Sequence, residues 1–140
     1  MAFTGNYSCN TLRTGLINGT LNFSTDTFRL ALYTNAATLD QTTAAYTSDG
    51  EASGGNYVAG GQLVTATVNT ALSSNSSTVY VNFSNPSWTG AITARGALIY
   101  DVTTGAAICV LDFGSDKIST ATFTVQMPSN TSTSALIRLV

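Results

Sequence analysis

The chain contains no histidine among its 140 residues, and only two cysteines. The absence of histidine removes the commonest general base and metal ligand, together with every Ser-His or Cys-His nucleophilic pair. Cys9 and Cys109 lie too far apart in sequence to suggest a zinc site. The low cysteine content favours two buried free thiols, with one disulfide as the alternative. We therefore predict no catalytic residue, no metal and no cofactor.

Charged side chains are also scarce, at 9% of residues against roughly 25% in an ordinary globular protein. Binding to nucleic acid needs clustered cations, and here they are scattered: Arg13, Arg29, Arg95, Lys117 and Arg138. No segment approaches the roughly 18 apolar residues of a membrane span. The first residues, MAFTGNYSCNTLR, lack the basic and apolar regions of a signal peptide. We expect neither nucleic acid nor membrane as a partner, and synthesis in a cytoplasm.

Seven carboxylates remain as candidates for chemistry, and only two pairs of them lie close in sequence. Asp49 and Glu51 share one segment, and a glycosidase needs two carboxyl groups held roughly 5–9.5 Å apart. Asp112 and Asp116 sit in LDFGSDK, but Ca²⁺ requires about six or more oxygens. Solvated or turn-capping acids explain both pairs better. The sequence therefore does not indicate an enzyme.

Hydrophobic residues make up 44% of the chain, and 24 Thr, 15 Ser and 11 Asn take the place of charges. Threonine and β-branched apolar residues favour strands. The stretch Ala94–Gly114 predicts a hairpin with strands Ala94–Asp101 and Ala106–Phe113, and Ile108 and Val110 on one face of the second strand. Because the second strand is apolar on both faces, we place the hairpin centrally in its sheet, with other layers or subunits against both faces.

Alternating or β-rich runs predict five further strands: Thr27–Thr34, Gln62–Val68, Thr78–Ser84, Ala121–Met127 and Ala135–Val140. One short N-terminal helix is expected over Ser8–Asn18, capped by Ser8 or Asn10, with Leu12, Leu16 and Ile17 on its apolar face. The chain as a whole, residues 1–140, is predicted to be a single all-β domain. Its expected architecture is an antiparallel β-sandwich or flattened barrel of about seven strands.

Two segments are predicted to lack regular structure. Met1–Tyr7 is an N-terminal arm, and Asn35–Gly61 is a long Gly/Thr-rich loop. Loops of this length in compact domains are usually functional or disordered. The tyrosines Tyr46 and Tyr57 favour an ordered loop that contacts something. Trp88, the only tryptophan, is interpreted as a core residue more readily than as a ligand platform.

Four motifs in order resemble one protein family: ALYT at Ala31–Thr34, GE–SG–Y–AGG within Gly50–Gly61, RGALIY at Arg95–Tyr100 and DFG at Asp112–Gly114. In this order and spacing the chain resembles a group of small structural proteins of tailed bacteriophages, chiefly phages of aquatic bacteria. The resemblance covers about residues 20–140 and carries no catalytic residues. It implies a virion component made in the host cytoplasm.

The resemblance implies, more narrowly, a capsid cement or decoration protein that bridges capsomers. Its expected partners are other copies of itself, with a trimer favoured, and the major capsid protein. The alternatives are a neck, tail or short-fibre component, or a carbohydrate-binding module that stacks sugars on Tyr46, Tyr57 or Trp88. On the cement interpretation the arm and the long loop are the contact segments, and the predicted contact residues are Phe3, Tyr7, Tyr46, Glu51 and Tyr57.

Overall fold

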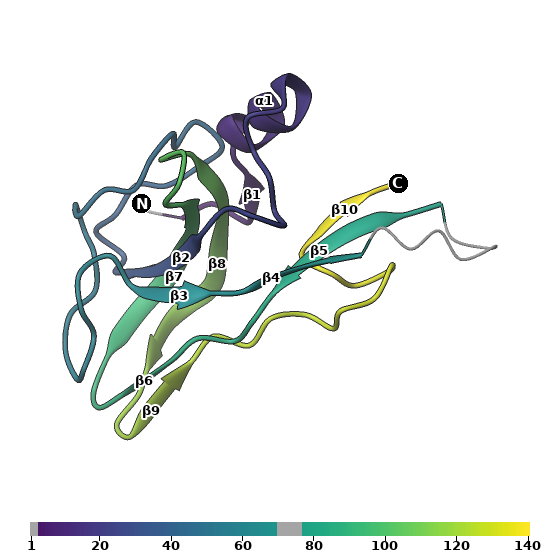
Figure 1. The fold of residues 1–140 in the computed structure, drawn as a ribbon. Coiled ribbons are helices and arrows are strands. Elements are labelled where there is room, and N and C mark those ends of the chain that lie inside the picture. The colour runs from purple at the N-terminus through teal and green to yellow at the C-terminus, as the bar shows by residue number, and fades with distance from the viewer. Residues whose placement is uncertain (1–2, 70–76) are drawn as a thin grey trace.

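The computed structural model describes residues 3–69 and 77–140. Within them the chain is all-β with one short helix, and every strand pairing is antiparallel (Figure 1). The elements are β1 (Tyr7–Ser8), α1 (Asn10–Asn18), β2 (Phe28–Tyr33), β3 (Gln62–Val64), β4 (Ala66–Asn69), β5 (Val79–Phe83), β6 (Ser87–Thr89), β7 (Thr93–Asp101), β8 (Ala107–Ile118), β9 (Thr122–Thr124) and β10 (Ile137–Leu139). The predicted all-β class is confirmed, and the sheets do not close into a barrel.

The described residues form ten strands rather than about seven. The strands β1 and β6 are additional to the predicted ones, and the predicted strand Gln62–Val68 is two strands, β3 and β4. The structure divides that run at Thr65, whose N–H donates to Ser84 Oγ at 2.8 Å while its carbonyl accepts the Ser84 N–H at 2.9 Å. At this point the chain stops pairing with β2 and begins to pair with β5, so β3 and β4 belong to different sheets. The linker Asn69–Ser77, whose polar residues predict a turn, lies largely outside the described residues.

The predicted hairpin is the centre of a five-stranded sheet of order β1-β8-β7-β2-β3. The hairpin also extends further than expected, because β6 and β9 continue the β7–β8 ribbon. Pairing keeps one register from Ser87, opposite Thr124, to Ala94, opposite Lys117. Two hydrogen bonds link the two parts. The Gly90 N–H donates to the Ala121 carbonyl, and the Ser119 N–H donates to the Ile92 carbonyl. A third sheet, β10-β5-β4, extends away from this body in Figure 1.

The β7–β8 pairing changes register twice, between Ala94 and Gly96 and between Ile99 and Tyr100. Ile99 pairs with Cys109 and Tyr100 with Ala107, so Ile108 is an extra residue on β8. Such a bulge breaks the two-residue alternation of side chains. Ile108 consequently packs in the same core cluster as Cys109, while Val110 packs in the other. The prediction that Ile108 and Val110 share a face is wrong for this reason.

The five-stranded sheet is covered on both faces. The larger core lies between this sheet and the two smaller ones, and it includes Leu30, Ile99, Val81, Phe83, Trp88 and Phe123. On the opposite face, Phe3 of the arm and Ala37 and Leu39 of the long loop pack against Tyr33 and Leu98. The prediction that both faces are covered is confirmed, and the second layer comes from the chain's own arm and loop.

Helix α1 begins two residues later than the predicted Ser8. Ser8 is taken up by β1, where it pairs with Cys109, so Cys9 occupies the N-cap position without a side-chain cap. Gly19 ends the helix in the left-handed conformation, with φ 76°. The predicted apolar face is partly wrong, because Ile17 is 89% exposed. Five residues after Leu12, Ile17 lies well off the face that Leu12 and Leu16 share.

Candidate functional site

The long loop is anchored around the carboxylate of Glu51. Tyr46 donates its hydroxyl to Oε2 at 2.6 Å, and Tyr57 donates its hydroxyl to Oε1 at 2.6 Å. The backbone N–H of Gly60 adds a third donor to Oε1 at 2.7 Å. Three predicted contact residues, separated by up to eleven positions in sequence, therefore meet at one carboxylate. Hydrogen bonds to a charged acceptor are the stronger kind, so this cluster holds the loop closed.

Backbone pairing explains why Glu51 arrives there. The strand β3 covers the edge of β2 only as far as Leu30, and beyond that point the loop takes its place. Thr34 N–H donates to the Gly50 carbonyl at 2.8 Å, and Ala52 N–H donates to the Leu32 carbonyl at 2.9 Å. Glu51 thus lies opposite Tyr33 as an added bridge of the sheet. The GE motif is where the loop joins the β2 edge.

Tyr57 and Gly61 fasten the far end of the loop. The Tyr57 hydroxyl accepts the Leu32 N–H at 2.9 Å while donating to Glu51, and its ring centroid lies 5.4 Å from that of Trp88. Gly61 has φ +78°, and a Cβ there would lie 1.8 Å from the Leu30 carbonyl oxygen. Only glycine fits so close to the backbone of β2.

The tyrosine hydroxyls of this cluster remain protonated hydrogen-bond donors at neutral pH. The hydrogen bond to Glu51, together with burial, raises the pKa of Tyr46 to about 12. Burial, and then the hydrogen bond to Glu51, raises the pKa of Tyr57 further still. A phenol of this kind does not act as a general base, so the arrangement is suited to holding a loop in place.

A second layer of aromatic contacts supports the same loop. The rings of Tyr46 and Tyr100 stack with centroids 5.1 Å apart, and the Tyr100 hydroxyl donates to the Gly60 carbonyl at 2.6 Å. Tyr33 donates its hydroxyl to the Thr47 carbonyl at 2.6 Å. Tyr33 and Tyr100 are buried, and Tyr46 is half-buried with its ring stacked on that of Tyr100.

The predicted contact residues of the arm are also engaged within the chain. Phe3 is 1% exposed, and its ring lies against Gly96, where a Cβ would come within 2.4 Å of it. Tyr7 is half-buried in β1, with its hydroxyl 2.5 Å from Thr4 Oγ1. A partner contact through the Phe3 ring would require the arm to leave the sheet. The contact role of all five predicted residues stays a prediction.

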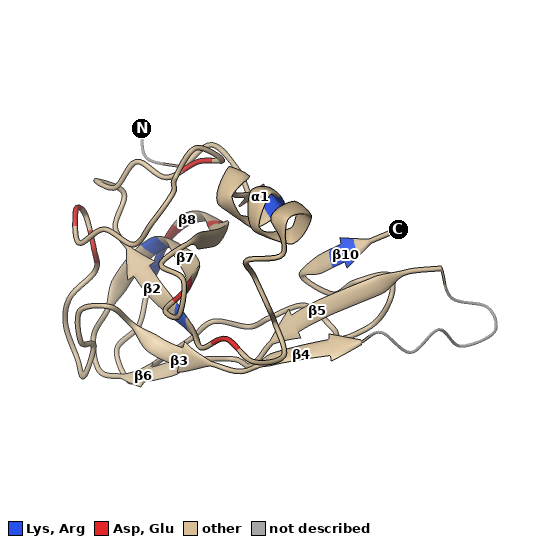
Figure 2. Cartoon of the chain, turned by 45° about the horizontal axis from the view of Figure 1, so that its top comes forward, with Lys and Arg blue, Asp and Glu red and all other residues tan. Residues whose placement is uncertain are grey.

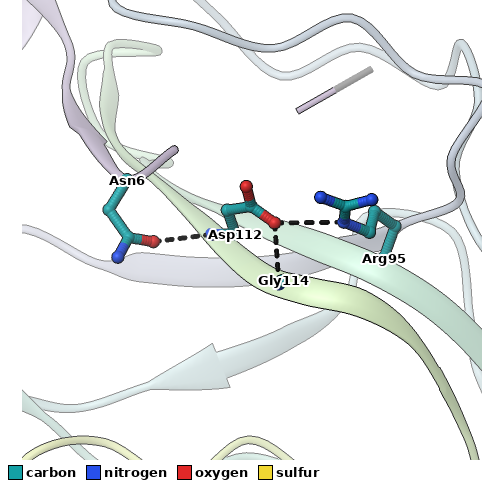
Figure 3. Close-up of polar contacts among 4 residues, drawn as sticks. All are labelled: Asn6, Arg95, Asp112 and Gly114. Atoms are coloured by element: carbon teal, nitrogen blue, oxygen red, sulfur yellow. Dashed lines mark hydrogen bonds and ion pairs between the residues drawn. The ribbon is translucent and has the colours of Figure 1, made fainter. Parts of the chain in front are cut away.

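The two acids of the LDFGSDK segment, Asp112 and Asp116, lie in different surroundings. Asp112 accepts hydrogen bonds from Arg95 Nε at 3.0 Å and from the Gly114 N–H at 2.8 Å, while its own N–H donates to Asn6 Oδ1 at 2.7 Å (Figure 3). Burial opposes ionisation, but the bonds from Gly114 and Arg95 outweigh it and hold the pKa of Asp112 below its usual value. Asp116 is exposed. The DFG motif thus anchors the arm and Arg95 at a bulge of β8 opposite Arg95.

No group of three or more His, Cys, Asp or Glu side chains able to hold a metal ion occurs within residues 3–69 and 77–140. Asp49 is exposed, and Glu51 is occupied by its three donors. Trp88 is 3% exposed and packs in the larger core, as expected for a core residue.

A groove of about 610 Å³ lies between α1 and β10, and it was not predicted from the sequence. Its lining includes Leu12, Leu16, Leu111, Ile137 and two cations, Arg13 and Arg138. No sequence pattern places these residues together, because they come from the two ends of the chain and from β8. The apolar residues at the C-terminus, read only as a last strand, were the available signal.

Comparison with known proteins identified no match among family models, curated proteins or solved structures. In the part of the chain that the structure describes, no helix is long and apolar enough to cross a membrane.

Proposed function

We propose that this chain is a structural protein of a tailed-bacteriophage virion, acting as a capsid cement protein. The proposal rests on the ordered set of motifs, from Ala31–Thr34 to Asp112–Gly114, that resembles small structural proteins of tailed phages. The places of these motifs in the fold support it. Glu51, Tyr57 and Gly61 of the second motif hold the loop on β2, and Asp112 of the last holds Arg95. Residues with such roles stabilise the fold, as expected for a structural protein of the virion.

The proposed mechanism is mass action of contacts. Each copy binds neighbouring capsomers, buries surface against them and so stabilises the assembled shell over separated or expanded states. The sparse charge and the many hydroxyl side chains leave little long-range repulsion between copies. We propose a homo-oligomer, with a trimer favoured, bound to the major capsid protein in the virion.

The neck, tail or short-fibre role remains the nearest alternative, because the same motifs and scaffold would serve there. A carbohydrate-binding module is less well supported. It requires exposed, coplanar rings, whereas Trp88 is buried and Tyr46 and Tyr57 donate their hydroxyls to Glu51. Sugar binding would need a surface other than these three rings.

Cryo-electron microscopy of purified virions, with quantitation of the protein on gels, tests the proposal. Hundreds of ordered copies over the capsomer junctions are expected. A small number of copies at one vertex or along the tail would overturn the cement role and favour the neck, tail or fibre role. Absence from purified virions would overturn both.

A further inference from the structure

The groove between α1 and β10 has the dimensions and lining of a binding cleft. Its volume of about 610 Å³ falls within the range of roughly 300–1,000 Å³ typical of ligand sites. The apolar side chains of Leu12, Leu16 and Leu111 line it. Leu139 and Val140 also line it, and they are 55% and 92% exposed. The chain therefore leaves an apolar cleft uncovered at this end.

Two edge strands border this groove. β1 is the outermost strand of the five-stranded sheet, and β10 is the outermost strand of the three-stranded sheet. Residues of both strands line the groove. An edge strand presents a row of backbone N–H and C=O groups without partners, which an added strand can pair with. The regular spacing of these groups matches an extended polypeptide.

The charged side chains that line the groove are of one sign. Arg13 and Arg138 line it, and no Asp or Glu side chain does. The Arg13 guanidinium is held by neutral partners, Asn10 Oδ1 at 2.9 Å and Ser8 Oγ at 2.8 Å. Between residues that the structure describes, the ion pair formed is Arg95–Asp112, on β7 and β8. In Figure 2 the ribbons of α1 and β10 each carry blue and neither carries red.

We infer that this groove receives an extended segment of a partner protein with alternating apolar and acidic side chains, added as a strand to the free edge of β10. Its apolar side chains cover Leu12, Leu16 and Leu111, and its carboxylates pair with Arg13 and Arg138. This inference rests on the proposed role as a virion structural protein, because that role supplies a partner polypeptide. Strand addition of this kind gives affinity through the backbone and specificity through side chains.

A second copy of the chain fits the groove less well. Antiparallel pairing of β10 with itself, in the register that pairs all three residues, sets Arg138 opposite Arg138. Like charges directly opposite each other destabilise a sheet. A small anion would satisfy the guanidinium groups but would leave the β10 edge and the apolar lining uncovered. An acidic strand satisfies all three features at once.

The test uses the full-length ¹⁵N-labelled chain and a fluorescein-labelled synthetic peptide that alternates valine and glutamate. A matched peptide carries lysine in place of glutamate. The glutamate peptide is expected to bind, with amide shifts centred on Ile137–Leu139 and Tyr7–Ser8, and the lysine peptide at least about tenfold more weakly. Arg138→Glu is expected to weaken binding of the glutamate peptide by about tenfold or more. Lys117→Glu makes the same change of net charge outside the groove, and it is expected to leave binding unchanged.

Equal binding of both peptides, amide shifts away from β10, or no binding would overturn the inference. Virion microscopy is independent of this result. If the chain is found on capsids but does not bind the glutamate peptide, the proposed function stands and the strand-addition site is overturned. A chain that binds the peptide at β10 but is absent from virions would retain the site and lose the proposed function.

Discussion

Asp101, the last residue of β7, lies fully buried beside the carboxyl group of Asp26. Its Oδ1 accepts the N–H groups of Thr103 at 2.8 Å and Thr104 at 3.1 Å, whereas Oδ2 has no N–H or O–H donor among the described residues. A nearby ionised carboxylate repels a second one, which favours the protonated form of Asp101. Burial, followed by the proximity of the Asp26 carboxyl group, raises the pKa of Asp101 above its ordinary 3.8.

Replacement of Asp101 by asparagine should remove a pH dependence of stability. Stability that depends on protonated Asp101 is complete below the ordinary carboxyl pKa and is lost as pH rises through the raised pKa of the folded state. The native chain should lose about 1.4 kcal/mol of unfolding free energy for each pH unit between these two values. Asp101→Asn has no carboxyl group to titrate at this position, so this loss of stability with rising pH should be absent. Urea midpoints from mildly acidic to mildly alkaline pH measure the difference.

Asp116→Asn is the matched control, because Asp116 is an exposed carboxylate that lacks these contacts. It should keep the slope of the native chain. A slope that persists in Asp101→Asn would show that the Asp26–Asp101 pair is not its origin.

The Glu51 cluster predicts unequal effects of two tyrosine substitutions. Tyr57→Phe removes a hydroxyl that donates to Glu51 and accepts from the Leu32 N–H, and it leaves that N–H unpaired. It should cost about 1–3 kcal/mol of unfolding free energy. Tyr46→Phe removes one donor to Glu51 from a half-buried side chain and should cost about 0.5–1.5 kcal/mol. Urea denaturation of both variants checks the order, and equal losses would argue against the dual role of Tyr57.

Phe3 and Gly96 form a contact whose two sides can be changed separately. Phe3→Ala should cost about 3–5 kcal/mol of unfolding free energy, as expected for a buried aromatic ring. Gly96→Ala should displace the same ring, because the added Cβ would meet it at 2.4 Å, and should also press on the Leu111 carbonyl at 2.5 Å. The loss of unfolding free energy in the double variant should therefore be smaller than the sum of the two single losses.

The measurement is a double-mutant cycle from chemical denaturation, with the oligomeric state followed in parallel. If Phe3→Ala leaves the stability of the subunit unchanged but alters the size of its assembly, the arm is a contact segment, as its sequence suggested. Full additivity would show that Gly96 does not act through Phe3.

Much of the fold could be predicted from local patterns. Alternation in Phe28–Tyr33 and Val79–Phe83 gave strands that the structure confirms, because strands with defined faces leave a period of two. The extra residue Ile108 could not be predicted, since a bulge depends on which partner residues pair across the strands. The change of sheet at Thr65 likewise depends on Ser84, nineteen positions away.

The site shows the same limit. Tyr46, Glu51 and Tyr57 were identified from their place in a long glycine-rich loop, but their direction was not. They point inward because Glu51 joins the edge of β2, an event that no periodicity within the loop encodes. The groove at β10 was missed because α1, β1, β8 and β10 contribute to it from distant parts of the chain.

The two cysteines predict a chain that is insensitive to redox conditions. Ser8 pairs with Cys109 and shares its face, so the next residue, Cys9, lies on the other face; accordingly Cys109 packs in the larger core and Cys9 in the smaller. Thiols on opposite faces of a sheet cannot adopt disulfide geometry. Reducing agent should therefore leave the melting temperature and the migration on non-reducing gels unchanged.

Thiol labelling provides the quantitative form of that prediction. Burial, followed by the charge of Asp40, raises the pKa of Cys9 from 9.0 to about 11, and burial raises that of Cys109. At mildly alkaline pH the reactive thiolate of Cys9 should fall on the order of 100-fold, and burial should slow the reaction further. Both thiols should react at once after denaturation in guanidinium chloride, which serves as the control. Rapid labelling of the folded chain, or a missing thiol after denaturation, would contradict the assignment of two buried free cysteines.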